Sequence, residues 1–175
     1  MEKYTKDSIG HFDYALASTG TKIVKSLTTS DYHSPNNFVS RWFNLGIKGK
    51  PPITALTPDV SFGNCWSFHN DKGVLTIALG KSTIPTDFTI DHISQNLTLD
   101  ISSAPKNISV YGFNKESDKV LLSSFIFDPH LNPTQSFPAS NILDKPVKFI
   151  QLQIHSNHGN KDFTCLYRFR VHSIK

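Results

Sequence analysis

The stretch that decides the fold reads Thr164-Cys165-Leu166-Tyr167-Arg168-Phe169-Arg170-Val171-His172 and lies near the end of the chain. It alternates as a β-strand does, so the odd positions face one side and the even positions the other. The other of the two cysteines lies upstream, in the aromatic segment Gly63-Asn64-Cys65-Trp66-Ser67-Phe68. We expect these two strands to meet, and the functional site to lie where they meet.

Composition favours one mainly β domain. The chain has 175 residues, enough to bury a core, and uses Phe 13 times but Met once. From Ala55 onward, short apolar segments alternate with Pro, Gly, Asn and Asp, which predicts strands at 65–68, 73–79, 87–92, 107–113, 120–127, 134–137, 149–156 and 163–172. We therefore expect a compact antiparallel β-sandwich, jelly-roll-like, with its core in 54–172.

Two further segments precede this core. Residues 1–20 contain the expected start of a short N-terminal helix, between Asp7 and Tyr14, and Gly20 ends it. Residues 23–27 read as a strand. Residues 28–52 form a long polar excursion with an apolar centre, which predicts a protruding hairpin that either packs on the core or binds a partner. Both readings stay open from the residues alone. The apolar centre is Phe38, Val39, Trp42, Phe43, Leu45 and Ile47.

Several functional classes lack support. The chain has no Gly-rich phosphate loop, nucleophile elbow or His-Glu-x-x-His motif, so we expect no enzyme. Its formal charge is +4, and no run of Lys and Arg exceeds two residues, so we expect no direct nucleic-acid partner. No stretch approaches 18 consecutive apolar residues, and no signal peptide is visible.

The two cysteines allow two interpretations. Cys65 and Cys165 are either joined by a disulfide or remain two buried thiols. A disulfide closing so long a loop would stabilise the protein by about 4–5 kcal/mol and would imply an oxidising compartment.

Six motifs, in the order in which they occur along the chain, resemble those of SUN domains, the luminal C-terminal domains of Sad1/UNC-84-type inner nuclear membrane proteins. The resemblance runs from about Tyr4 to His172, so the SUN domain would take up residues 1–175, with a lid at 28–52. The motifs are Asp13-Tyr14-Ala15-Leu16-Ala17-Ser18-Thr19-Gly20, Pro58-Asp59-Val60, Gly63-Asn64-Cys65-Trp66-Ser67-Phe68, Ser103-Ala104-Pro105-Lys106, Ser156-Asn157-His158-Gly159 and Cys165-Leu166-Tyr167-Arg168-Phe169-Arg170-Val171-His172.

The resemblance implies a receptor for the C-terminal tail of KASH-domain proteins. Such a LINC complex joins the inner and outer nuclear membranes across the perinuclear space. Animal members form a homotrimer through an upstream coiled coil and reach the membrane through an upstream anchor. This chain shows neither, which fits a fragment of a longer protein.

The resemblance also assigns a pocket. Ser103 and Tyr167 match residues whose hydroxyls bind the tail's terminal carboxylate, and His92 matches a third pocket residue. Phe163 stands where the family has a tyrosine, so one hydroxyl is lost. Read without the family, Ser103 is a turn former, Tyr167 a core residue and His92 a surface histidine.

Other family features carry over by position. Cys65 and Cys165 match an intramolecular disulfide, and the apolar centre of 28–52 matches the lid. The loop 54–65 matches one that holds a potassium or sodium ion, and we expect no other cofactor. The main-chain carbonyls concerned are those of Thr54, Thr57, Asp59, Asn64 and Tyr167.

The chain departs from the animal pattern at the start of the lid. Thr28 replaces a cysteine that bonds to some KASH tails, so we expect no intermolecular disulfide. Because the lid sequence also diverges, we expect a fungal or other non-animal member.

Two rival functions remain. The domain would serve as a scaffold in a spindle-pole or nuclear-envelope complex without using the pocket, or it would bind carbohydrate, as similar sandwiches do.

Overall fold

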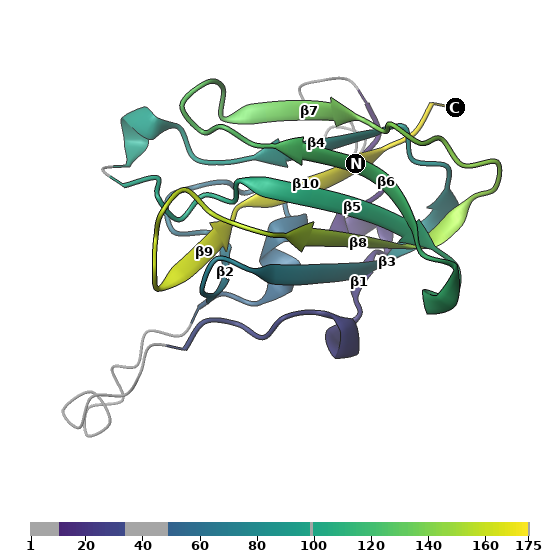
Figure 1. The fold of residues 1–175 in the computed structure, drawn as a ribbon, viewed down its shortest axis with the longest axis horizontal. Helices are drawn as coiled ribbons and strands as arrows, with labels where there is room; N and C mark the ends of the chain where they lie inside the picture. The colour runs from purple at the N-terminus through teal and green to yellow at the C-terminus, as the bar shows by residue number, and fades with distance from the viewer. Residues whose placement is uncertain (1–10, 34–48, 99, 175) are drawn as a thin grey trace.

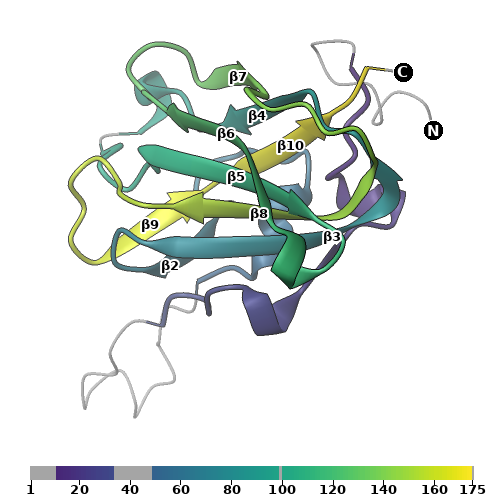
Figure 2. The same cartoon turned by 45° about the vertical axis from the view of Figure 1, so that its right-hand side comes forward.

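Two layers of antiparallel β-sheet face each other across one core in the computed structural model, which describes residues 11–33, 49–98 and 100–174 (Figures 1 and 2). The larger sheet has the strand order β1-β3-β8-β5-β6. Its strands are β1 (Lys22–Ile23), β3 (Gly73–Thr83), β8 (Val147–Ile154), β5 (Asn107–Phe113) and β6 (Val120–Ile126).

The opposite layer is built from two smaller sheets. One has the order β10-β4-β7, and the other pairs β2 with β9. Figure 2 shows β10 crossing behind β5 and β8. The strands are β10 (Arg168–His172), β4 (Asp87–Asp91), β7 (Thr134–Pro138), β2 (Trp66–His69) and β9 (Phe163–Leu166). The expected antiparallel β-sandwich is confirmed.

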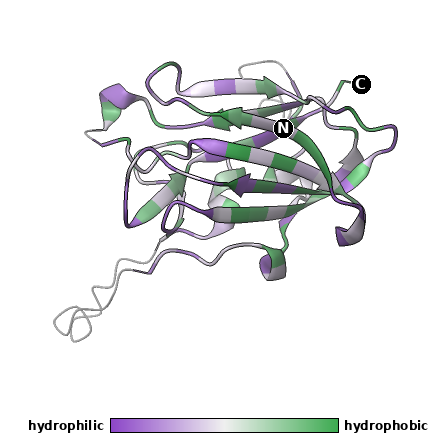
Figure 3. Ribbon diagram, in the orientation of Figure 1, coloured by the Kyte–Doolittle hydropathy of each residue, from purple (hydrophilic) through white to green (hydrophobic). Residues whose placement is uncertain are grey.

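Residue alternation fixes which face of each strand is buried. Ile108 and Val110 of β5 are fully buried, as is Ile150 of β8. They pack with Phe88 and Ile90 of β4 in one apolar core. Figure 3 shows hydrophobic and polar residues alternating along these strands.

The closing stretch is two strands, which corrects the expectation of one strand at 163–172. β9 pairs with β2, whereas β10 pairs with β4, so the chain changes sheets at Tyr167. Phe169 and Val171 therefore join the main core, while Tyr167 joins a separate cluster with Cys65 and Cys165.

Both arginines of β10 are buried and ion-paired. Arg168 donates to Asp13 over 3.0 Å, and Arg170 donates to Asp91 through two bonds of 2.6 Å. Asp91 also accepts a hydrogen bond from the Thr134 hydroxyl at 2.7 Å. Two charged side chains on a strand that reads as half-exposed are thus ion-paired inside the protein, although the buried Arg168 Nε has no hydrogen-bond partner among the described residues.

The expected N-terminal helix, which would start between Asp7 and Tyr14, lies in part outside the described residues. Residues 11–33 contain no α-helix, but they contain the 3-10 helices η2 (Ala17–Thr19) and η3 (Lys25–Leu27), with Gly20 in the left-handed region at the end of η2. The predicted strand at 23–27 is therefore wrong beyond Ile23, because the chain leaves the sheet edge and turns. The remaining 3-10 helices are η4 (Pro52–Leu56), η5 (Gln95–Leu97) and η6 (Glu116–Asp118).

The expected lid falls mostly outside the described residues. Those of its apolar residues that we named for the lid all lie in 34–48, outside the described residues: Phe38, Trp42, Phe43, Leu45 and Ile47. Its two ends are described. The Tyr32 N–H donates to the Ser67 carbonyl at 2.7 Å, and the Gly49 N–H donates to the Tyr32 carbonyl at 2.8 Å. Both ends of the excursion are therefore fastened beside β2. Within the described residues, no helix is long and apolar enough to cross a membrane.

Candidate functional site

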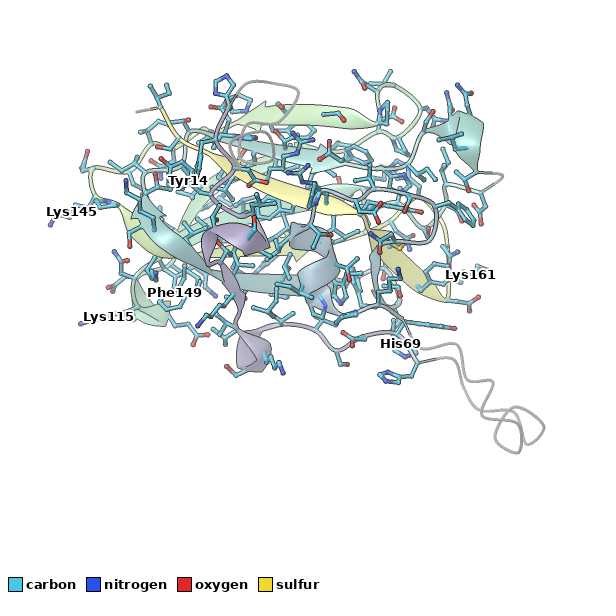
Figure 4. The ribbon with its side chains drawn as sticks, turned by 180° about the vertical axis from the view of Figure 1, so that it is seen from behind. Tyr14, His69, Lys115, Lys145, Phe149 and Lys161 are labelled. Atoms are coloured by element: carbon cyan, nitrogen blue, oxygen red, sulfur yellow. A yellow bond between two sulfur atoms is a disulfide. The ribbon has the colours of Figure 1, made fainter. Side chains whose placement is uncertain are left out.

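A cavity of about 560 Å³ opens where the β2–β9 pair meets the rest of the sandwich. Ser103, Tyr167, His92 and Phe163 all line it. The end of the molecule that carries β2 and β9 also carries His69 and Lys161, opposite the end with Lys115 and Lys145 (Figure 4). The fold thus brings together four residues that are up to 75 positions apart in sequence, and their role in binding stays a prediction.

Tyr167 is placed by the passage between the two sheets. Its side chain is 5% exposed, and its hydroxyl oxygen accepts a hydrogen bond from the Gly63 N–H at 3.2 Å. Burial raises the pKa of this phenol above its ordinary value. The hydroxyl therefore keeps its proton and has that proton available for an acceptor in the cavity.

His92 follows the last residue of β4 and is 4% exposed. Its Nδ1 lies 3.0 Å from the Ile93 carbonyl oxygen, so the proton belongs on Nδ1. Its ring meets the Tyr167 ring edge-on, with centroids 4.8 Å apart. Burial lowers the pKa of His92 more than the hydrogen bond to the Ile93 carbonyl raises it, and the nearby His158 also lowers it, so the imidazole is neutral at pH 7. The interpretation of His92 as a surface histidine is wrong.

Ser103 is half-buried in the connection from β4 to β5. Its carbonyl oxygen accepts a hydrogen bond from the Cys165 N–H at 2.9 Å, which fixes this connection against β9. The serine hydroxyl therefore sits on a backbone position tied to the same strand that leads to Tyr167.

Phe163 opens β9 and is half-buried. Its ring lies 5.5 Å from the Tyr32 ring, which in turn lies 4.5 Å from His69. Because it has no hydroxyl, Phe163 contributes an apolar wall to the cavity. Tyr32 lines the same cavity from the segment before the excursion.

A disulfide joins Cys65 to Cys165, as the resemblance implies, with Cα atoms 5.6 Å apart. Cys165 also pairs with Ser67 in the register of β9 and β2, and both cysteines line the cavity. The structure thus confirms that the two cysteine strands meet.

The residues Thr54 to Cys65 form the loop expected to hold a monovalent cation. Carbonyl oxygens are suitable ligands for hard cations. The Thr54 carbonyl, however, already accepts two hydrogen bonds from Thr57, from its N–H at 3.2 Å and its hydroxyl at 2.8 Å. The Asp59 carbonyl accepts one, from the Asn64 amide at 2.7 Å. Thr54 therefore fits poorly as a ligand, while Asp59 keeps a second lone pair. Among the described residues, no group of three His, Cys, Asp or Glu side chains has metal-site spacing.

Thr28, expected to replace a partner-bonding cysteine, lies at the edge of β3. Its hydroxyl donates to the Val24 carbonyl at 2.9 Å and accepts from the Thr76 N–H at 3.0 Å. This side chain closes local backbone bonds and has no sulfur to form a disulfide.

Sequence reasoning missed part of the cavity wall, which the fold assembles from separate loops. The missed lining residues include Tyr32, Lys50, Phe62, Ile93 and Asp100. Phe62 carried a usable signal, since it directly precedes the Gly63-Asn64-Cys65-Trp66 motif, whereas Lys50 lies 14 positions before Asn64. A larger hollow of about 630 Å³ is lined by turn residues, among them Asn70, Lys72 and Asn160, and by none of the predicted site residues.

This geometry defines a class of protein before any comparison. A cavity with hydroxyl donors, an aromatic wall and a neutral histidine can bind a polar group with an apolar neighbour. The class that the fold and this cavity define is an antiparallel β-sandwich domain with a partly polar, partly aromatic cavity.

Comparison with known proteins gives the family. The model of the Sad1/UNC-like C-terminal family matches residues 46–175. Mouse SUN domain-containing protein 3 is 38% identical over 180 residues, which cover 99% of this chain and 56% of that protein. Klaroid protein of Drosophila melanogaster is 35% identical over 175 residues, covering 97% of this chain and 18% of that protein. The chain belongs to the Sad1/UNC-like C-terminal family, that of the SUN domains.

The relatives also bear on the expected origin of the chain and on how much of a full-length protein it represents. The expected non-animal origin is not supported, because the relatives described above are animal proteins and the human SUN domain-containing protein 3 is 36% identical as well. The chain spans 56% of the length of the mouse protein, 50% of the human protein and 18% of Klaroid protein.

Solved structures support the fold. A family 32 carbohydrate-binding module from Streptococcus pneumoniae EndoD superposes with a TM-score of 0.64 and covers 93% of this chain and 99% of that module. Its sequence identity is 11%, so the likeness concerns the architecture alone.

Proposed function

We propose that this domain is a receptor for the C-terminal tail of a KASH-domain protein. The observation that carries the proposal is the Tyr167 hydroxyl, buried in a cavity shared with Ser103 and already accepting a hydrogen bond from Gly63. Its remaining proton is therefore free for a ligand acceptor, and a terminal carboxylate is the strongest acceptor that a peptide offers.

The need for such donors follows from the cost of burying charge. A carboxylate that leaves water without hydrogen bonds is destabilised by several kcal/mol or more. Tyr167 and Ser103 would supply two hydroxyl donors, while Phe163 and Tyr32 would pack against the apolar part of the tail. Main-chain pairing with an extended tail would add affinity along a free strand edge.

In the cell, this binding would join the inner and outer nuclear membranes in a LINC complex and pass cytoskeletal force to the nucleus. The domain would face the perinuclear space, where an oxidising environment suits the Cys65–Cys165 disulfide. The full-length protein would form a homotrimer and reach the membrane through an upstream anchor. The rival role is a scaffold that does not use the cavity.

The deciding experiment compares two synthetic peptides of a KASH C-terminal tail, one with a free carboxylate and one amidated. Isothermal titration should show binding of the free acid and a loss of at least tenfold for the amide, about 1.4 kcal/mol. Equal affinities would contradict the carboxylate mechanism. Normal nuclear anchoring in cells that carry Ser103→Ala with Tyr167→Phe would favour the scaffold role.

A potassium or sodium ion at the loop 54–65 is part of this proposal. The carbonyl oxygens of Thr57, Asp59, Asn64 and Tyr167 would hold it, with Thr54 disfavoured by its two existing hydrogen bonds. The ion would stiffen the turn that carries Gly63 and so position Tyr167. Replacing both cations by choline in the titration should then lower tail affinity, and unchanged affinity would argue against an ion.

A further inference from the structure

Lys50 is a feature of the cavity that neither the sequence motifs nor the comparisons assign. Its backbone forms an isolated parallel bridge with the fully buried Trp66, so the residue has a fixed starting point beside β2. Its side chain is exposed and lines the same cavity as Tyr167 and Ser103. An ammonium group is therefore available at the rim of the site.

The ammonium is held in place by its own partner. Lys50 Nζ donates to Asn64 Oδ1 at 2.7 Å. Asn64 is fixed in turn, since its amide donates to the Asp59 carbonyl at 2.7 Å and its N–H to the Ser61 carbonyl at 2.9 Å. This chain of hydrogen bonds restricts the lysine and lowers the entropy that it would lose on binding a ligand.

The same turn also contacts Tyr167. Gly63, the residue before Asn64, donates its N–H to the Tyr167 hydroxyl at 3.2 Å. Two successive residues of one turn therefore position the phenol and the ammonium. The Tyr167 hydroxyl and the Lys50 ammonium therefore both belong to the part of the cavity lining that surrounds this turn.

The charge balance of the lining makes Lys50 distinctive. Among the lining residues that the structure describes, Lys50 is the single side chain with a permanent positive charge, and Asp100 is the single acidic one. His92 is neutral, because burial lowers its pKa. Asp59 lies near Lys50, but hydrogen bonds from Ser61 are the main cause of its lowered pKa and the lysine charge contributes least.

From this arrangement we propose that Lys50 is a specificity-determining residue, which selects ligands with a carboxylate at the Tyr167 end of the cavity. The proposal rests on the proposed function and names the charge that attracts the ligand's anionic end.

The test is a cycle of protein variants against the two KASH tail peptides, free acid and amide. Lys50→Gln should weaken binding of the free acid about two- to fivefold at low ionic strength, since the pair is exposed, and should leave the amide unchanged. Lys50→Arg, which keeps the charge, should restore wild-type affinity. Lys106→Gln, an exposed lysine outside the cavity, is the matched control and should change neither.

Salt provides a second readout that a purely structural role would not move. The wild-type affinity for the free acid should fall as the NaCl concentration rises, and this dependence should be reduced in Lys50→Gln. Equal losses for acid and amide, or an unchanged affinity in Lys50→Gln, would overturn the proposal while leaving the proposed function standing.

If the wild-type protein bound neither peptide, the proposed function would fail, and Lys50 would be judged with acetate as the probe. Its side-chain NMR signals should move on titration with sodium acetate, compared with sodium chloride at equal ionic strength, more than those of Lys106. Equal movement of the two lysines would overturn the role of Lys50 as a carboxylate contact.

Discussion

Tyr167 shows how one residue takes a role from its position between two sheets. It follows β9, precedes β10, and turns into a small cluster with the disulfide and Ile93 instead of the main core. Its phenol is buried and hydrogen-bonded to Gly63, yet it still lines a cavity. A tyrosine in a regular core strand would have its hydroxyl satisfied within the protein.

Removing the two hydroxyls tests this assignment. Ser103→Ala combined with Tyr167→Phe should weaken the binding of a carboxylate-ended tail by about 2–4 kcal/mol, because two hydroxyl donors of the cavity lining are lost. Titration calorimetry measures the loss, and thermal unfolding confirms that the double variant is folded. An affinity within twofold of wild type would show that these hydroxyls do not meet the ligand.

His92 should make stability depend on pH. Its folded-state pKa lies below the unfolded value of 6.5, because burial disfavours the imidazolium. Below about pH 6.5 the unfolded chain takes up a proton that the folded protein does not, so stability falls as pH falls, by at most about 1.4 kcal/mol per pH unit. The loss ends below the folded-state pKa.

Urea unfolding at a series of pH values from 7.5 to 5 checks this expectation. His92→Gln should show a shallower decline than wild type, whereas the exposed His130→Gln should follow wild type. Parallel profiles for wild type and His92→Gln would mean that another group sets the pH dependence.

At the scale of the elements, β3 holds the N-terminal segment on the sandwich. β1 pairs with it at Ile23, and Val24, Thr28 and Thr29 continue to bond with Thr76 and Val74. Farther along, Gly80 donates its N–H to the Thr21 hydroxyl at 3.1 Å and lies against Thr19 and Gly20. This close approach lets 3-10 helix η2 end directly beside the strand.

A side chain at Gly80 should disrupt that approach. The Cβ of Gly80→Ala would overlap the carbonyl oxygen of Thr19, which is backbone and cannot turn away. The variant should lose about 1–3 kcal/mol of unfolding free energy. Chemical denaturation measures it, with Lys81→Ala as an exposed neighbour that should change stability by about 0.5 kcal/mol or less. Equal stability of the two variants would show that the segment adjusts at little cost.

At the scale of the whole molecule, the Cys65–Cys165 disulfide closes a loop of 100 residues around most of the sandwich. The loop includes β3, β4, β5, β6, β7 and β8, and its ends are the paired strands β2 and β9. The bridge therefore restricts the unfolded chain more than it adds contacts to the folded one.

Opening the bridge should cost about 4–5 kcal/mol of unfolding free energy in the chain-entropy model. Cys65→Ala with Cys165→Ala, and wild type under reducing agent, should both unfold at lower denaturant than oxidised wild type. Intact mass after alkylation, with and without reduction, verifies one bridge. Two free thiols in oxidised, folded wild type would refute the disulfide.

Much of the fold follows from the local pattern. Segments such as 107–113 match the observed strand β5 because period-two alternation and flanking turns act over a few residues. Strand ends and the N-terminal part were predicted less well. β3 runs to Thr83 instead of 79, and residues after Ile23 turn into η3, because neighbouring segments decide where pairing stops.

The sequence by itself determined the family, the sandwich, and the residue types of the pocket, since the motifs around Cys65 and Cys165 carry them directly. Only the tertiary structure decided which residues share the cavity. It divided the closing stretch at Tyr167, because β2 pairs with the part before this residue and β4 with the part after it. The Tyr167 phenol therefore turns toward the site. It also brought Lys50 into contact with Asn64, which lies 14 positions later in the sequence. This contact depends on how the chain turns between them, so no periodic pattern in the sequence predicts it.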